Sequence, residues 1–377
     1  MKVSIVTTVC NGEKFLSETI ESILSQRGDF DLEYILVDGK STDSSLSIAH
    51  KYKKLVDGGY YSDRRLSTSM TVISEKDKGM YDGIAKGLKL CSGDVIAYLN
   101  SDDFYVPNSL SAVVDVLDKF PQVKWVSGCF SSSNEAGYIL YSSPSEIDTT
   151  LIREGIYGHY SEFYIPQEST FWRRELLESV ELDKFSNYRY AGDFFLWYNF
   201  AEKHTLYSIN SQLGVFRRRE NQISSDILFY KMEVKKILDN NVGLSAMDKA
   251  KFICNECLKQ QSSIRWSEKA KKWKISRRAN YFVKYSHYLF GLFLVYVFHL
   301  GLNEIKKINY MFSIDEMDSK SKGYFINKEV CYESDRVIKK IRVLGVPVIK
   351  AVYYKNKAKY FVCGILLWKI RYVCQRD

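Results

Sequence analysis

Two adjacent carboxylates, Asp102 and Asp103, follow an apolar stretch at residues 94–99 that is typical of a buried strand in a parallel sheet. Open α/β sheets bind their ligands at the carboxyl ends of such strands. Adjacent carboxylates repel each other unless a cation lies between them, which favours a divalent metal that holds a phosphate-bearing ligand. Aspartate is also a common helix cap, and Pro107 opens a predicted helix shortly afterwards. The pair alone therefore leaves both a metal site and a cap open.

Two further aspartates stand at positions where a carboxylate can do chemistry. Asp38 follows a predicted strand at residues 33–37 and precedes a glycine, which favours a ligand-binding role over that of a turn residue. Asp193 stands at the start of an aromatic helix, where it is either the N-cap or a base that the helix N-terminus keeps ionised. The arginine run at 217–219 either adds positive charge to such a site or forms a solvated surface.

The elements that must position these residues alternate between strand and helix from the first residue. Apolar runs predict the strands and apolar residues with helical spacing predict the helices, so right-handed crossovers and a mostly parallel sheet are expected. The turn at 7–12 lacks the G-x-G-x-x-G pattern of dinucleotide-binding Rossmann domains, and the polar stretch at 57–69 predicts a loop. Strands are predicted at residues 2–9, 33–37, 71–74 and 94–99, and then at 123–130, 137–141, 169–172, 205–209 and 213–216.

The composition is that of an ordinary globular protein. The chain has 377 residues, of which 46% are hydrophobic and 26% charged, so two or three domains are expected. The N-terminus enters a strand at once, which argues against a signal peptide, and the eight cysteines are expected to be free thiols in a reducing cytoplasm. The net charge of +9 is concentrated at residues 265–284 and after residue 339, which suits a nucleic acid or an anionic membrane surface.

Six segments follow one another in an order that resembles the family 2 glycosyltransferases of the GT-A fold. They are V-S-I-V-T-T-V-C-N-G, I-L-V-D-G-K-S-T-D-S-S, S-E-K-D-K-G-M-Y-D-G-I-A-K-G, S-G-D-V-I-A-Y-L-N-S-D-D, Q-E-S-T-F-W-R-R and A-G-D-F-F-L-W. Each segment alone is a weak signal, but the ordered set is specific and covers about residues 1–225. It is most similar to the bacterial branch that builds O-antigen, capsule or exopolysaccharide. The resemblance implies an α/β fold with a mostly parallel sheet and helices on both faces.

The resemblance also implies a role for each matching residue. Asp193 would be the catalytic carboxylate, Asp103 would hold Mg²⁺ or Mn²⁺ on the diphosphate, and Asp102 would lie near the ribose or diphosphate. The residues implied for the rest of the donor are Thr8, Cys10, Asn11 and Asp38 for the nucleotide, and Lys78, Gly79, Tyr81 and Asp82 for the sugar.

The implied chemistry is an inverting displacement. Asp193 would take the proton of an acceptor hydroxyl as it attacks C1 of the donor sugar, and a cation at Asp103 would stabilise the leaving diphosphate. Asn100 stands where many members have an aspartate, which weakens the expected metal site. The chain also lacks the Q-x-x-R-W motif of processive synthases, which favours the addition of a single sugar.

The last third of the chain combines basic and aromatic residues. The uninterrupted apolar core at 288–302, within the aromatic stretch 281–302, is shorter than the roughly 20 residues of a membrane span. An interfacial helix is therefore favoured over a span or a buried core helix. Two repeated segments at 342–350 and 361–369 predict short strands in hairpins. The predicted domains are a catalytic domain at 1–225, a helical, basic-aromatic and membrane-associating region at 226–318, and a β-hairpin tail at 319–377.

Together these patterns predict an inverting, metal-dependent glycosyltransferase in the cytoplasm, at the inner face of the plasma membrane. The expected donor is a nucleotide sugar, with a UDP-sugar favoured, and the expected acceptor is a glycan that is linked to polyprenyl diphosphate or soluble. A sugar nucleotidyltransferase is an alternative, but residues 7–12 hold no basic residue to cradle a triphosphate. A non-catalytic membrane adaptor is the other alternative, and the four aspartates argue against it. No nucleic-acid partner is expected, because the basic residues surround the most apolar segment.

Overall fold

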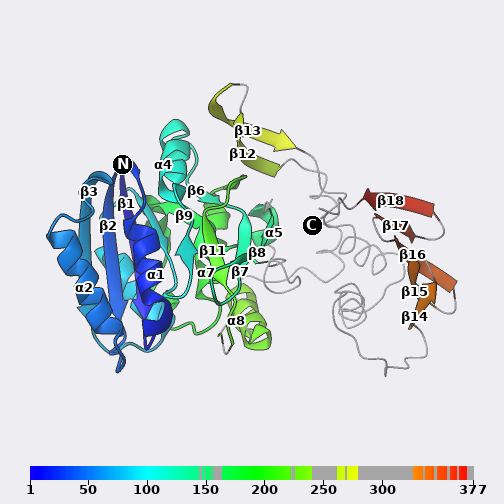
Figure 1. The fold of residues 1–377 in the computed structure, drawn as a ribbon, viewed down its shortest axis with the longest axis horizontal. Coiled ribbons are helices and arrows are strands. Elements are labelled where there is room, and N and C mark those ends of the chain that lie inside the picture. Colours follow the sequence, from blue (N-terminus) through cyan, green and yellow to red (C-terminus); the bar gives the residue numbers. More distant parts are fainter. Residues whose placement is uncertain are drawn as a thin grey trace. The chain divides into compact units, whose positions relative to one another are not determined.

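The chain forms two compact units, Met1–Asn309 and Tyr310–Asp377. The first unit contains a nine-stranded and a four-stranded sheet with their helices, and the second contains a five-stranded sheet (Figure 1). The computed structural model describes residues 1–143, 147, 149–153, 155, 164–220, 222, 226–239, 261–267, 270–278, 326–333, 336–343, 346–354, 357–362 and 365–371.

The amino-terminal half of the large sheet is parallel. β1 (Lys2–Val9) pairs with β2 (Gly28–Asp38) on one side and with β4 (Val95–Tyr98) on the other, and β2 also pairs with β3 (Arg65–Ser74). Residues 3–9 of β1 are all buried, as expected for a central strand that is covered on both faces. The predicted α/β architecture with a mostly parallel sheet is confirmed.

The connecting helices cover this half of the sheet through their apolar sides. α1 (Glu13–Leu24) and α2 (Ser45–Asp57) contact each other and lie on the near face in Figure 1. α3 (Met80–Leu90) contacts β1 and β2, and α4 (Ser109–Lys119) contacts β2. A Cβ atom on Gly87 of α3 would lie 2.3 Å from the side chain of Val6, so only glycine permits this close approach of helix and strand.

The carboxyl-terminal half of the large sheet is mixed. β9 (Thr170–Arg173) runs antiparallel to both of its neighbours, β4 and β6 (Trp125–Ser127). β10 (Leu206–Ile209) then pairs with β6 in parallel. The four-stranded sheet consists of β5 (Phe104–Tyr105), β11 (Gly214–Arg217), β7 (Phe130–Ser133) and β8 (Ile139–Ser143). The shorter elements are α5 (Thr149–Arg153), η2 (Gln167–Ser169), η3 (Arg174–Ser179) and α6 (Leu182–Phe185).

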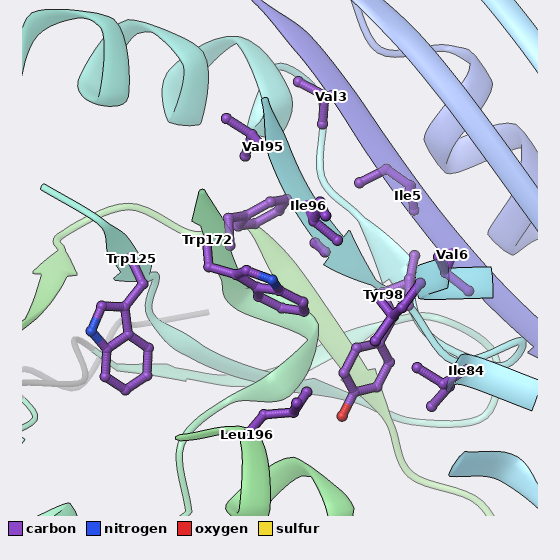
Figure 2. Packing of buried hydrophobic residues seen from close by; sticks show 14 of the residues in the cluster. Val3, Ile5, Val6, Ile84, Val95, Ile96, Tyr98, Trp125, Trp172 and Leu196 are labelled. Atoms are coloured by element: carbon purple, nitrogen blue, oxygen red, sulfur yellow. The ribbon is translucent and has the colours of Figure 1, made fainter. Parts of the chain in front are cut away.

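Large aromatic side chains fill the space between the mixed half and α7 (Gly192–Lys203). Trp172 of β9 is fully buried, and its ring centroid lies 5.6 Å from that of Trp197 and 6.3 Å from that of Tyr98. Figure 2 shows the rings of Trp125, Trp172 and Tyr98 along this interface. A single aromatic cluster therefore joins the parallel half of the sheet to the mixed half.

The first unit differs from the expectation drawn from the sequence in two respects, and the first is the bounds of several strands. β2 begins at Gly28 rather than at residue 33, and the single strand predicted at 123–130 is divided between β6 and β7, which belong to different sheets. β3 begins at Arg65, so the polar stretch at 57–69 is only partly a loop. Its exposed positions are mostly polar, which hides the strand pattern, and the buried Arg65 side chain donates to the backbone oxygens of Leu24 and Gln26.

The second difference is a β-hairpin within the region predicted to be helical. β12 (Gln261–Ser267) pairs with β10 in parallel and with β13 (Lys272–Arg278) in the antiparallel sense, which extends the large sheet by two strands. Apolar side chains alternate with polar ones in both strands, and this period of two is typical of a strand rather than a helix. α8 (Ile227–Asp239), in the same predicted region, is helical and contacts α7.

The second unit is an antiparallel sheet in which each strand pairs with the next, which confirms the predicted hairpins. Its strands are β14 (Ile326–Glu333), β15 (Arg336–Val343), β16 (Val346–Tyr354), β17 (Lys357–Val362) and β18 (Ile365–Arg371). The apolar segment at 281–302 lies outside the described residues, and the domain boundaries at 225 and 318 stay predictions. None of the helices in the described ranges has the length and apolar character to cross a membrane.

Candidate active site

The candidate residues gather at the carboxyl ends of β1, β2 and β4. Asp38 is the last residue of β2, and the loop that carries Asn100, Asp102 and Asp103 directly follows β4. β1 lies between β2 and β4 in the sheet, so the loops that follow β2 and β4 lie on opposite sides of β1. At such a switch point the loops of an open α/β sheet diverge and form a ligand-binding crevice.

The turn between β1 and α1 brings three predicted nucleotide-binding residues next to the loop after β2. Thr8 is buried, whereas Cys10 is exposed. Asn11 has a positive φ of 55°, and its Oδ1 accepts a hydrogen bond of 2.8 Å from the backbone N–H of Thr42. The chain's own hydrogen bonds therefore hold the turn and the loop together.

A cluster of acids surrounds Asp38 at this end of the sheet. Asp38 is fully buried, and its carboxylate accepts hydrogen bonds from the backbone N–H of Ser41 (3.1 Å) and the hydroxyl of Ser74 (2.6 Å). Asp77 belongs to the same cluster, because burial and the charges of Asp82 and Asp38 raise its pKa. Asp77 lies within the segment S-E-K-D-K-G, so its signal was present in the sequence although no role was predicted for it.

Of the four residues predicted to border the donor sugar, Tyr81 points in a different direction from Lys78, Gly79 and Asp82. Asp82 accepts a hydrogen bond of 3.0 Å from the backbone N–H of Lys78, and the position of a Cβ atom on Gly79 is open space. Tyr81 instead points inward from α3, and its hydroxyl lies 3.4 Å from Oδ1 of Asp193. The start of α3 thus connects the nucleotide end of the site with the predicted catalytic carboxylate.

Asp193 lies in the first turn of α7, whose N-cap is Ala191 rather than Asp193. Its Oδ1 accepts a hydrogen bond of 2.7 Å from the backbone N–H of Phe194, and the hydroxyls of Tyr81 and Tyr230 also donate to this carboxylate. Burial raises the pKa of Asp193 to about 6, and the three donors oppose that rise. Asp193 is therefore mostly ionised at neutral pH and able to accept a proton.

The start of α7 is held in place by α8, which lies beyond the segments that resembled a catalytic domain. The carboxylate of Glu233 accepts hydrogen bonds from three successive backbone N–H groups, those of Arg189 (3.0 Å), Tyr190 (2.8 Å) and Ala191 (2.8 Å). Tyr230, on the same helix, reaches Asp193 itself. Sequence reasoning missed Tyr230 and Glu233, because a tyrosine and an acid three residues apart on a helix form no recognisable motif.

The Asp102–Asp103 pair lies beside two arginines at the end of β11. Nε of Arg219 lies 2.6 Å from Oδ2 of Asp102 in an ion pair. Asp103 is fully buried, and its Oδ1 accepts a hydrogen bond of 2.8 Å from the backbone N–H of Arg217. The other oxygen, Oδ2, accepts one of 3.3 Å from the side chain of Asn100. Burial raises the pKa of Asp103 well above its usual range, and the neighbouring Asp102 raises it further.

The three arginines at 217–219 have different surroundings in the structure. Arg217 is buried, its guanidinium forms an ion pair of 2.6 Å with Glu18, and its Nε donates to the backbone oxygen of Asp102 at 2.7 Å. Arg218 is exposed, and Arg219 faces Asp102. Arg217 therefore anchors the loop after β4, while Arg219 brings a positive charge to the candidate site.

The acids described here do not fit a divalent cation that the protein holds by itself. Mg²⁺ and Mn²⁺ need several oxygen ligands, but both oxygens of Asp103 already accept hydrogen bonds and one oxygen of Asp102 is paired with Arg219. The side-chain N–H groups of Asn100 donate to Asp103 and to Oε1 of Gln167, both at 3.3 Å, and the Oδ1 of Asn100 is buried without a hydrogen-bond partner among the described residues. Within the described ranges, no three His, Cys, Asp or Glu side chains are arranged to hold a metal ion. The metal-binding role predicted for Asp103 therefore disagrees with its surroundings, because this carboxylate anchors β11.

Glu168 is a second buried acid that sequence reasoning did not select. It lies in η2, is 4% exposed, and its Oε1 is buried without a hydrogen-bond partner in the described part of the chain. Burial raises the pKa of Glu168 to about 8, and the charge of Asp193 adds to this rise. Its charge also acts on Asp103, so Glu168 is an electrostatic neighbour of both ends of the site. The segment Q-E-S-T-F-W contains Glu168, but no role was inferred for it.

Comparison with known proteins relates part of this sequence to an established family. Residues 4–179 match the family described as Glycosyl transferase family 2. The chain is 28% identical to EpsE of Bacillus subtilis over 246 residues, which cover 61% of this chain and 81% of EpsE. It is 34% identical to poly(ribitol-phosphate) beta-glucosyltransferase of Bacillus spizizenii over 105 residues, which cover 28% of this chain but only 15% of that protein. TarS 1–349 of S. aureus superposes with a TM-score of 0.46 at 16% identity, over 82% of this chain and 88% of that one.

Proposed function

Because residues 4–179 place this chain among the family 2 glycosyltransferases, we propose that it moves one sugar from a nucleotide-sugar donor to a glycan acceptor. The name of one similar protein, poly(ribitol-phosphate) beta-glucosyltransferase, supports a bacterial cell-surface polymer as the product. A UDP-sugar is the favoured donor. The transfer inverts the configuration at C1, since the acceptor attacks from the face opposite the diphosphate.

The observation that carries this proposal is the environment of Asp193. Its carboxylate is held by donors from α3, α7 and α8, and its pKa of about 6 leaves it ionised at neutral pH. In the proposed step the acceptor oxygen forms a bond to C1 while the bond from C1 to the diphosphate breaks. The electron pair of that bond leaves on the diphosphate, and Asp193 takes the proton of the acceptor hydroxyl.

The donor is proposed to lie along the carboxyl ends of β1, β2 and β4. The nucleotide would occupy the turn with Thr8, Cys10 and Asn11, above Asp38, and the diphosphate would reach Asp102. Lys78, Gly79 and Asp82 would border the sugar. Tyr81 takes a different role from the one predicted, because its buried hydroxyl positions Asp193 instead of facing a ligand.

The acceptor is proposed to be a glycan on polyprenyl diphosphate, reached from the cytoplasmic face of the membrane. Support comes from α8, where four large apolar side chains are 44–70% exposed on the helix whose Tyr230 contacts Asp193. These side chains are Ile227, Leu228, Phe229 and Met232. A membrane surface beside the site would present a lipid-linked acceptor to it.

The proposed function is tested by calorimetry of the full chain with UDP, GDP, dTDP and CMP. We expect one nucleotide to bind more tightly than the others, because hydrogen bonds between the turn after β1 and the loop after β2 hold this part of the site in a fixed shape. CMP serves as the matched monophosphate. If a sample with the circular dichroism of a folded α/β protein bound none of the four nucleotides, that result would be incompatible with a donor site.

The pH dependence of transfer should follow Asp193. Its raised pKa means that the base is lost by protonation as the pH falls through about 6, so the rate should fall below that value and level off above it. The Tyr230 hydroxyl lowers this pKa by donating to the carboxylate, so Tyr230→Phe should move the acid limb upward by about one pKa unit. The measurement is kcat against pH for both enzymes.

The control for this variant is Tyr60→Phe, at a tyrosine that is 62% exposed. It removes the same hydroxyl from the surface and should leave the acid limb where it is. A purely structural role for Tyr230 would lower the rate at every pH without moving the limb, and that result would contradict the assignment of Tyr230 as a positioning residue.

A further inference from the structure

Arg219 forms an ion pair with Asp102, the residue next to Asp103, where the resemblance led us to expect a metal ion. Its Nε lies 2.6 Å from Oδ2 of Asp102, and both side chains keep contact with solvent, at 36% and 16% exposure. A guanidinium is planar and always charged, and its paired N–H groups match the oxygens of a phosphate. The ion pair thus presents a suitable anion-binding group at the carboxyl end of β4.

The turn that carries Arg219 is fixed by its own hydrogen bonds. The backbone N–H of Arg219 donates to Oε1 of Gln222 at 3.1 Å, and Nε2 of Gln222 donates to the backbone oxygen of Arg217 at 2.6 Å. Arg217 is buried under the rings of Phe15 and Phe104, 4.8 and 5.0 Å from their centroids. The guanidinium of Arg219 is therefore held toward Asp102 by a rigid base.

The helix N-termini near the site already bind side chains of the chain itself. The backbone N–H of Glu13 in α1 donates to Oδ2 of Asp43 at 3.0 Å, and that of Ser44, the N-cap of α2, donates to Oε2 of Glu13 at 2.8 Å. Anions usually bind at helix ends through such backbone N–H groups. Because these groups are engaged, the charge of a diphosphate must be balanced by a side chain or an ion.

The geometry points to Arg219, rather than a divalent metal, as the positive group that stabilises the diphosphate of the donor. This inference rests on the proposed function. A divalent ion on Asp102 would lie beside the guanidinium that shares the same carboxylate, and the two positive charges would repel each other. Asp102 then acts as a positioning residue that aims Arg219 at the ligand.

The proposed reaction is complete without a further reactant. The acceptor oxygen bonds to C1, the bond from C1 to the β-phosphate oxygen breaks, and its electron pair stays on that oxygen. The acceptor proton passes to Asp193. The N–H groups of Arg219 hydrogen-bond to the leaving diphosphate and offset the negative charge that it gains.

The test is calorimetric titration of the full chain with UDP, GDP and dTDP, once in excess EDTA and once with Mn²⁺. We expect the nucleotide that binds to do so in EDTA, with a Kd within about threefold of the value in Mn²⁺. Arg219→Ala should weaken binding by about tenfold or more under both conditions, and Arg219→Lys should weaken it less, because lysine keeps the charge but not the planar pair of donors. The control is Arg218→Ala, at the exposed neighbour, which should leave the affinity unchanged.

Two other results would overturn the inference in different ways. Binding that disappears in EDTA, returns with Mn²⁺ and is the same in Arg219→Ala would assign the diphosphate to a metal after all, while leaving the proposed function intact. The absence of binding for every nucleotide under both conditions would remove the proposed function, and the inference with it. The comparison of EDTA with Mn²⁺ uses the unaltered protein, so it decides the question even where a variant fails to fold.

Discussion

Asp193→Asn is expected to lower the rate of sugar transfer by about 10³-fold while nucleotide affinity stays nearly unchanged. Asparagine has the same shape as aspartate, and its single acceptor oxygen can keep the hydrogen bonds from Phe194 and Tyr81, which both reach Oδ1, but it cannot take the acceptor proton. The loss should therefore appear in kcat and not in the Kd of the nucleotide. Single-turnover transfer and nucleotide calorimetry on the same preparation measure the two quantities.

The matched control for this variant is Asp183→Asn. Asp183 lies in α6, its side chain is 93% exposed, and its ion pair with Lys89 is at the surface. The same chemical change there should leave transfer within about twofold of the unaltered enzyme, as for most surface substitutions. A loss of nucleotide affinity in Asp193→Asn as large as its loss of rate would show that Asp193 holds the donor, which would contradict its assignment as the base.

Trp172→Ala is expected to destabilise the first unit by about 3–5 kcal/mol, which is a large part of the stability of a typical domain. Trp172 is fully buried and contacts Tyr98, Trp197 and Phe200, so its removal leaves a cavity at the joint between the two halves of the sheet (Figure 2). β9 contributes this residue between β4 and β6, so the halves cannot close the cavity without losing strand pairing. Urea denaturation followed by circular dichroism measures the effect.

The control for the cavity variant is Trp266→Ala in β12. Trp266 is 44% exposed, although its ring also contacts another tryptophan, Trp273, at 5.5 Å. Its removal deletes the same side chain but leaves no enclosed space, and it should cost about 1 kcal/mol or less. Equal losses in the two variants would indicate that the aromatic cluster is not the joint that holds the sheet together.

The first four strands and three helices were predictable because their signals are local. β1 was predicted with its observed bounds, since an apolar run with β-branched residues describes a strand that is buried on both faces. The start of β3 was missed, because an edge strand that exposes polar residues carries no such pattern. The antiparallel insertion of β9 between β4 and β6 depends on contacts between distant segments, and no local pattern encodes it.

The candidate site was predictable to the extent that its residues sit in recognisable segments. Asp38, Asp102, Asp103 and Asp193 were selected in this way, and the structure places them at the end of β2, in the loop after β4 and in the first turn of α7. The sequence does not show which oxygen of each carboxylate already accepts a hydrogen bond within the protein. The two oxygens of Asp103, for example, are satisfied by Asn100 and by Arg217, which is more than 100 positions away along the chain.

The same limit applies to the residues that were missed. Glu168 lay within a quoted segment, but its burial depends on how η2 packs near β11, and burial is what raises its pKa. Tyr230 and Glu233 lie in a helix that no motif marks. Their importance follows only from the position of α8 beside the start of α7.

The hydrogen bonds from the backbone before α7 to Glu233 have a consequence for how such an enzyme diversifies. The part of the chain that matches the family ends at residue 179, yet the proposed base, its positioning tyrosine and Arg219 all come later in the chain. Under the proposed function, mutations in α7 and α8 can alter the geometry of proton removal while the turn and loops after β1, β2 and β4 stay unchanged. The residues proposed for proton removal can therefore change independently of residues 4–179, which match the family. Similarity over residues 4–179 is then a poor guide to the acceptor of the sugar.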